Sequence, residues 1–147
     1  MGDLTPAMED IGELLIETTK ERFKTSTAPD GSPWEKNSFA TLMTHLQGRK
    51  GVFSKRDGGL TKKGAKLAAN KKPLIGESKS LSEQFHYQAS RTSVEVGSSV
   101  HYAPIHQFGG QAGRDKKVTI PARPFLGLSE SDKRAVLEII EEHLAGR

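Results

Sequence analysis

Histidines are the residues of this sequence best suited to chemistry, because an imidazole can bind a metal ion or move a proton near neutral pH. His101 and His106 lie five positions apart in the stretch HYAPIHQFGG, and His86 lies upstream. In an extended strand, residues five apart point to opposite faces, so the pair shares one ion only if Pro104 turns the chain. The spacing matches no standard zinc signature, and no carboxylate lies between residues 96 and 114. The sequence therefore favours histidines that hydrogen-bond in or beside a sheet over a metal site.

A hydrolase needs catalytic or metal-binding residues close together, and this sequence does not place such residues together. Metal-dependent nucleases hold their ions with clustered carboxylates. Here Glu9, Glu13, Glu17 and Glu21 follow one another at four-residue steps, which is typical of the exposed stripe of a helix. No G-x-S-x-G or phosphate-binding glycine motif is present, and the absence of cysteine excludes a thiolate nucleophile and a cysteine-based zinc site. We therefore expect no enzyme, no cofactor and no metal.

The stretch from Arg49 to Lys72 is strongly basic. It contains nine Lys or Arg residues against one acid, Asp57, whereas both ends of the chain are rich in acids. The nine basic residues are Arg49, Lys50, Lys55, Arg56, Lys62, Lys63, Lys66, Lys71 and Lys72. They would attract a phosphate backbone without sequence preference, or an acidic protein partner. A solvated, flexible loop explains the same composition, and both interpretations stay open.

Length and composition indicate one domain over residues 1–147 with a lean core. Hydrophobic residues make up 34% of the chain and aromatic residues 6%, so polar segments that contribute little to the core are expected. The N-terminus lacks the basic and apolar regions of a secretory signal, and no window approaches the apolar length of a membrane span. A soluble, intracellular protein without membrane contact is expected.

The order of the elements predicts an α+β domain. Apolar residues at three- and four-residue steps predict a helix over residues 6–24, begun by Thr5 as its cap. A loop that brings Trp34 back to the core, a short helix over 39–46 and a long basic loop over about 47–73, with a brief helical turn near 63–69, are expected next. Alternation predicts strands over 80–88 and 92–98, a third extended piece over 100–108, a flexible turn over 109–114 and a strand over 117–120. An S-x-x-D capping box at Ser129 starts a final helix. The two terminal helices are expected to cover one face of a small antiparallel meander sheet.

Two rigid segments are candidates for contact with other subunits. The segment VTIPARPFLGLS holds Arg123 between two prolines, and a simple strand-to-helix connector needs no arginine there. In HYAPIHQFGG, Pro104 and the glycine pair are expected to fix the neighbouring side chains in one arrangement. The predicted contact residues are Tyr102, His106, Gln107, Phe108, Gly109, Gly110, Arg123, Pro124 and Phe125.

These segments also carry a resemblance. VEVGSSVHYAPIHQFGG and IPARPFLGLSESDKRAVLEIIEEHL closely resemble the phage virion morphogenesis family, the tail-completion proteins of Mu-like tailed phages. The upstream DGSPWEKN and PLIGESKSLSEQF resemble further segments of that family.

The resemblance implies a structural protein of the virion neck, assembled in the host cytoplasm. It would complete the tail and join it to the DNA-filled head as a ring, most simply a hexamer, around the DNA channel. Its partners would be copies of itself, the connector, stopper or tail terminator, the tail tube, and packaged DNA by non-specific contact. A tail-terminator or connector-stopper ring subunit is the alternative. A DNA-binding protein or metal-dependent nuclease that uses the basic stretch with His86, His101 or His106 is more distant.

Overall fold

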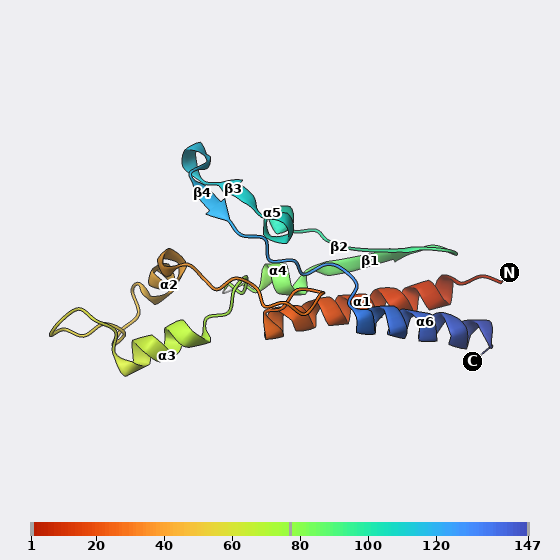
Figure 1. Ribbon diagram of the computed structural model, residues 1–147, viewed down its shortest axis with the longest axis horizontal. Coiled ribbons are helices and arrows are strands. Elements are labelled where there is room, and N and C mark those ends of the chain that lie inside the picture. The colour runs from red at the N-terminus through yellow and green to blue at the C-terminus, as the bar shows by residue number, and fades with distance from the viewer. Residues whose placement is uncertain (1, 77, 147) are drawn as a thin grey trace.

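The computed structural model describes residues 2–76 and 78–146 and confirms an α+β fold (Figure 1). The helices are α1 (Thr5–Thr25), α2 (Phe39–Leu46), α3 (Lys62–Asn70), α4 (Ser80–Glu83), α5 (Ala103–Phe108) and α6 (Glu130–Leu144), with a 3-10 turn η1 (Arg114–Lys116). The strands are β1 (Phe85–Ala89), β2 (Val94–Ser98), β3 (Gly110–Ala112) and β4 (Val118–Ile120). Within these residues, no helix combines the length and apolar content that crossing a bilayer requires.

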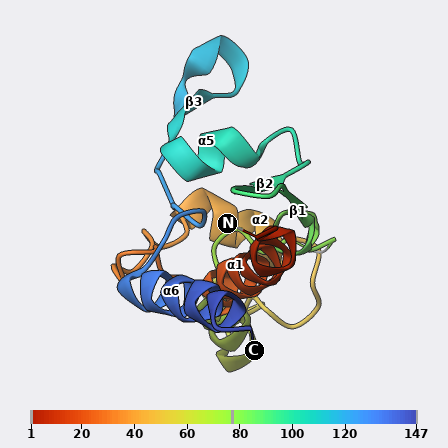
Figure 2. The same cartoon turned by 90° about the vertical axis from the view of Figure 1, so that its right-hand side faces the viewer.

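The body of the molecule is built on α1, which packs against the β1–β2 hairpin and against α6 (Figures 1 and 2). The predicted apolar stripe is confirmed, because Met8, Ile11 and Phe23 are buried. Gly12 lets the hairpin approach closely, since a Cβ atom there would lie 2.5 Å from the Tyr87 ring. The helix that covers the hairpin is α1, and α6 packs against α1. Asp3, not Thr5, receives the first free amide of α1, and Thr5 is already helical.

An aromatic cluster fills the core beside the C-terminal end of α1. The Phe23 ring centre lies 5.2 Å from that of Trp34 and 5.3 Å from that of Phe125. Trp34 is 6% exposed and Phe125 is fully buried, so the predicted return of the tryptophan to the core is confirmed. Each such ring pair adds about 0.5–1.5 kcal/mol beyond the area it buries.

A buried ion pair locks α6 onto α1. Asp132 accepts a hydrogen bond from the Arg22 guanidinium at 2.5 Å, and both side chains are less than a tenth exposed. Arg22 also donates to the carbonyl of Phe125 at 2.7 Å. The predicted capping box is confirmed, since Ser129 and Asp132 exchange hydrogen bonds between side chain and backbone. Asp132 therefore both starts α6 and neutralises Arg22.

The strands do not form one meander. Among the described residues, strand β1 pairs only with β2, and β3 pairs only with β4, as two separate antiparallel sheets. The extended piece expected over 100–108 is wrong, because α5 forms there with Pro104 in its first turn, where proline gives up no helical hydrogen bond. The strand expected over 80–88 begins with α4, and the turn expected over 109–114 contains β3. The helix α5 thus separates the two hairpins along the chain.

The basic stretch is folded and not only a loop. Helix α3 replaces the brief turn expected near 63–69, and Thr61 caps it by accepting from the Gly64 amide. Leu46 and Val52 are fully buried, and Gly64 lies directly on the Val52 carbonyl. Helices α2 and α3 with their connecting loop project from the body (Figure 1). We call residues 39–72 the basic arm.

Candidate functional site

The two segments with the most distinctive motifs, around α5 and residues 121–127, pack directly on each other. The Gln107 side-chain oxygen accepts hydrogen bonds from the amides of Phe125 at 3.0 Å and Leu126 at 2.9 Å. Its amide nitrogen donates to the Leu126 carbonyl at 3.0 Å. The backbone amide of Arg123 donates to the His106 carbonyl at 2.7 Å. The Gln107 side chain therefore pairs with the backbone amides and carbonyl of residues 125 and 126, as a neighbouring strand would.

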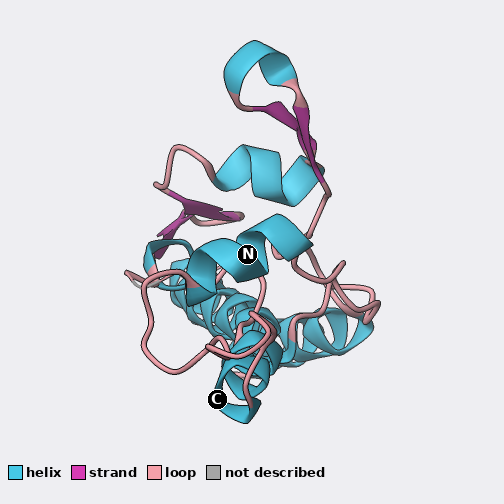
Figure 3. Ribbon diagram, turned by 90° about the vertical axis from the view of Figure 1, so that its left-hand side faces the viewer, coloured by secondary structure: helices cyan, strands magenta, loops and turns pink. Residues whose placement is uncertain are grey.

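The tryptophan loop joins the same contact. The Trp34 indole donates to the Pro124 carbonyl at 2.7 Å. The Arg123 guanidinium donates to the carbonyls of Glu35 at 2.7 Å and Lys36 at 2.9 Å. We call the contact among residues 34–36, 103–109 and 121–126 the three-segment junction. It fixes the base from which the β3–β4 hairpin projects (Figures 2 and 3).

The junction uses several of the predicted contact side chains inside the chain. Gln107 and Arg123 have the partners given above, Arg123 is 8% exposed, and Phe125 belongs to the aromatic core. Gly109, with φ of +74°, is held against Ala122, where a Cβ atom would lie 2.9 Å from the backbone nitrogen. In this conformation the Arg123 and Phe125 side chains are buried, whereas Gln107 is half-buried and keeps part of its surface accessible.

Phe108, Tyr102 and Gly110 are predicted contact residues that the structure leaves exposed. Phe108 is 78% exposed at the end of α5, beside the projecting hairpin, and Tyr102 is 38% exposed. Pro124 is half-buried inside the junction, where its carbonyl accepts the Trp34 bond. Contact with another subunit stays a prediction for this set.

The histidines do not converge. His86 and His101 are exposed on β1 and in the turn before α5, whereas His106 is half-buried in α5. Within residues 2–76 and 78–146, no three His, Asp or Glu side chains gather as a metal site would require. The His106 ring meets the edge of the Tyr102 ring, with centres 6.1 Å apart. Its Nδ1 atom is buried and no described residue hydrogen-bonds it, which corrects the expectation of a hydrogen-bonded ring for this atom.

Burial and the nearby positive charge of Arg123 both lower the pKa of His106. Both effects favour the neutral form of the ring in the folded protein. It lines a cavity of about 330 Å³ where the basic arm meets α5, together with Thr41, Lys71 and Arg123. His106 therefore packs where the basic arm meets the body.

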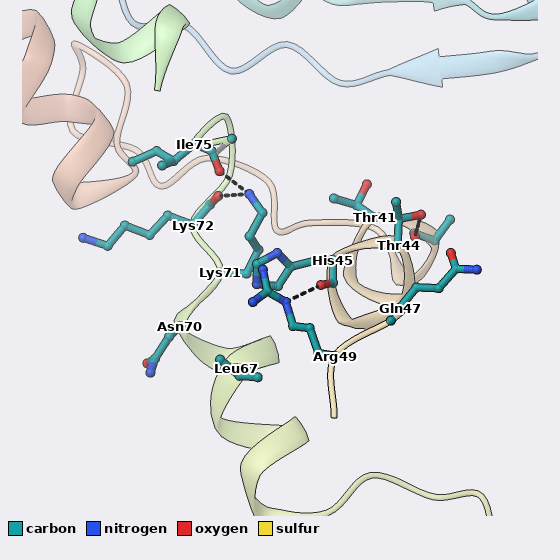
Figure 4. A pocket seen from close by; sticks show the side chains of 13 residues that line it. Thr41, Thr44, His45, Gln47, Arg49, Leu67, Asn70, Lys71, Lys72 and Ile75 are labelled. Atoms are coloured by element: carbon teal, nitrogen blue, oxygen red, sulfur yellow. Dashed lines mark hydrogen bonds between the residues drawn. The ribbon is translucent and has the colours of Figure 1, made fainter. Parts of the chain in front are cut away.

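A larger hollow of about 1080 Å³ lies between α2 and the end of α3 (Figure 4). His45 and Arg49 line it from one side and Lys71 and Lys72 from the other. Lys71 donates to the carbonyls of Lys72, at 3.0 Å, and Ile75, and burial lowers the pKa of Lys71. Lys72 donates to the Lys24 carbonyl at the end of α1, at 2.9 Å. These two lysines attach the arm to the body.

All nine predicted basic residues lie on the basic arm, and all except the half-buried Lys71 are exposed. Lys55 and Arg56 lie in the loop that closes between Phe53 and Leu60, and Lys62, Lys63 and Lys66 lie on α3. The structure thus concentrates positive charge on one projecting element. His45 and Thr41 were not predicted as lining residues, although their spacing on the predicted helix over 39–46 places them on one face.

Known proteins resemble this chain in sequence. The model of the phage virion morphogenesis family matches residues 1–145. The Mu-like prophage FluMu G protein 2 of Haemophilus influenzae is 42% identical over 71 residues, which are 48% of this chain and 51% of that protein. The alignment thus spans about half the length of this curated relative. No solved structure matches the chain.

Proposed function

We propose a place in the virion for this chain, which belongs to the phage virion morphogenesis family. Membership in that family supports a role in phage virion assembly, and we propose that this role is structural. Within this role, the proposed position is the neck, where the subunit completes the tail and joins it to the DNA-filled head. The similar Haemophilus influenzae protein is a Mu-like prophage protein, and we propose a particle of that kind for this chain too.

The observation that carries the proposal is the large surface of the single subunit. The chain exposes 10159 Å² at a mass of 16.0 kDa, whereas a compact monomer of that mass exposes about 7,400 Å². The excess of about 2,800 Å² is larger than the ~1,600 Å² that a standard protein interface buries in total. A subunit of this shape is suited to being covered by neighbours in an assembly.

The projecting elements supply surfaces for such neighbours. The β3–β4 hairpin contains two strands only, so the outer edge of each strand carries unpaired amides and carbonyls. A strand from an adjacent protein can pair with these groups. The exposed Phe108 lies where the hairpin leaves the junction and offers an apolar anchor. We propose a ring of copies, with a hexamer as the expected number, that neighbouring neck and tail proteins contact through these elements.

The test is electron microscopy of particles from a phage or prophage that lacks this chain. We expect DNA-filled heads beside separate, complete tails, because the joining step is lost while both parts still assemble. Supplying the chain from a plasmid should restore joined particles. Tails of uncontrolled length would instead assign a tail-terminator role, and heads that lose their DNA would assign a stopper role. Heads that never filled with DNA, or absent tails, would contradict a position at the neck.

A single substitution sharpens the test. Phe108→Ala should reduce the yield of joined particles, because it removes the exposed anchor without touching the aromatic core. Leu128→Ala removes a 49% exposed apolar side chain away from the hairpin and serves as the control. Equal yields for the two variants would remove Phe108 from the proposed contact.

A further inference from the structure

Opposite charges gather at the two ends of the longest axis of the molecule (Figure 1). The basic arm carries nine Lys or Arg residues and Asp57 between residues 49 and 72, a net charge of +8. At the other end, the N-terminal part of α1 and the C-terminal part of α6 lie side by side, joined by His143 and Asp10 at 2.9 Å. Residues 2–19 and 135–146 contain eight acids and no Lys or Arg, a net charge of −8 with histidine neutral. We call these two stretches the acidic end.

The acids of the acidic end face solvent. They are Asp3, Glu9, Asp10, Glu13, Glu17, Glu138, Glu141 and Glu142, all exposed. Because the two charged regions lie at opposite ends, one copy cannot bring them together. A second copy can, with its basic arm on the acidic end of the first.

Both regions also expose apolar side chains among the charges. On the basic arm, Phe53 is 41% and Leu60 45% exposed, and their backbones pair across the loop. On the acidic end, Leu137 is 58% and Leu144 61% exposed. Leu137 and Leu144 are seven residues apart, so they share the face of α6 that carries Glu141. An apolar centre within a charged rim is the usual composition of a protein–protein interface.

We propose that the basic arm of one copy docks on the acidic end of the next copy, head to tail. This contact is heterologous, so repeated docking closes into a ring when the rotation between copies allows it. The inference deepens the structural role proposed above and rests on it. Its test uses purified protein, whereas the neck position is tested in particles, so the two can fail separately.

Docking of a second copy would cover more of the charged and apolar surface at the two ends than binding of DNA would. A duplex would neutralise the basic arm, but it would repel the acidic end and leave Leu137 and Leu144 uncovered. The opposite charges of the two ends would steer copies into one relative orientation. Contact with both ends would also cover part of the excess surface of the subunit.

The first measurement is sedimentation velocity of the nuclease-treated wild-type chain over a range of concentrations. We expect association at about 0.02 M salt that weakens roughly tenfold or more at about 0.5 M salt, because screening reduces attraction between exposed charges. A chain that stays monomeric at low salt and high concentration would overturn the proposal.

The decisive experiment exchanges the charges. The arm variant carries Lys55→Glu, Lys62→Glu and Lys66→Glu, and the end variant carries Glu9→Lys, Glu138→Lys and Glu141→Lys. Each variant alone should associate at least about tenfold more weakly than wild type, because like charges now meet. A mixture of the two should associate again, since every contact in an alternating assembly pairs opposite charges. Circular dichroism and thermal unfolding confirm that each variant is folded.

A matched control reverses three exposed positive charges outside both regions, Lys79→Glu, Arg114→Glu and Lys117→Glu. It should associate like wild type. If the mixture stays dissociated, or if the control weakens as much as the arm variant, head-to-tail docking is wrong. If the arm variant loses duplex DNA binding in a gel shift but still self-associates, the arm faces DNA and the proposal is overturned.

Discussion

The body and the basic arm of this chain differ in how many side chains they bury. The body surrounds the aromatic cluster of Phe23, Trp34 and Phe125 and the buried pair of Arg22 and Asp132. The basic arm has Leu46 and Val52 as its fully buried apolar side chains and is otherwise half-buried or exposed, apart from Gly64. Stability in a protein is not uniform, and regions with few buried contacts open at lower free energy. The comparison indicates that the body sets global stability and that the arm can open locally while presenting its charges.

The largest expected effect breaks the buried pair of the body. Asp132→Asn should lower the free energy of unfolding by about 3–5 kcal/mol, because the Arg22 charge is left buried without a counter-charge. Urea unfolding measures the loss. Glu130→Gln is the control, since its exposed pair with Lys133 should contribute less than about 1 kcal/mol. Equal effects of the two variants would contradict the central role given to the buried pair.

A substitution in the basic arm should act locally. In Gly64→Ala, the new Cβ would lie 2.2 Å from the Val52 carbonyl oxygen, so α3 must shift from the loop. We expect the free energy of local opening to fall by about 1–3 kcal/mol. Hydrogen exchange should show faster exchange at the Thr61 amide, which bonds the Val52 carbonyl at 3.0 Å, and unchanged exchange in α1.

Gly76→Ala is the control for this prediction, because no atom lies within 4 Å of the new Cβ. If Gly64→Ala accelerates exchange equally in α1 and in the arm, the two regions unfold together and the distinction between them is wrong.

The smallest expected effect concerns His106, which packs where the basic arm meets the body. The folded protein lowers the pKa of His106 below the ordinary value of 6.5, so the unfolded chain binds the proton more readily. The His106 contribution to stability is therefore present above pH 6.5 and is lost as the pH falls from there toward the folded pKa. His106→Gln should flatten the dependence of the unfolding midpoint on pH between about 7.5 and 5.5. His101→Gln, at an exposed histidine five residues earlier, should leave the wild-type slope unchanged.

Helices with regular apolar spacing and local caps could be predicted from the sequence. The helix expected over 6–24 appears as α1, the one over 39–46 as α2, and Ser129 starts α6 as expected. These signals lie within a few residues of one another, so they need no knowledge of the rest of the chain. The α5 helix was missed because Pro104 was interpreted as a break in a strand, although proline also suits the first turn of a helix.

The roles of the site residues were less predictable. Arg123 is predicted to contact another subunit, which stays a prediction, and its partners within the chain are the carbonyls of Glu35 and Lys36, 88 and 87 residues away. Gln107 is predicted in a subunit contact, and the structure adds that its side chain holds the backbone at 125 and 126. Sequence spacing carries no information about which distant carbonyl a guanidinium or an amide will meet.

By itself, the sequence determined the α+β class, the terminal helices, the β1–β2 hairpin and the concentration of positive charge between residues 49 and 72, because each follows from local periodicity, capping and composition. Only the tertiary structure decided that Arg22 pairs with Asp132, that the two hairpins remain separate and that the opposite charges lie at opposite ends. These features depend on contacts between residues far apart in the chain. Such contacts are selected by burial and by the need to satisfy every buried polar group, which no short window of sequence reveals.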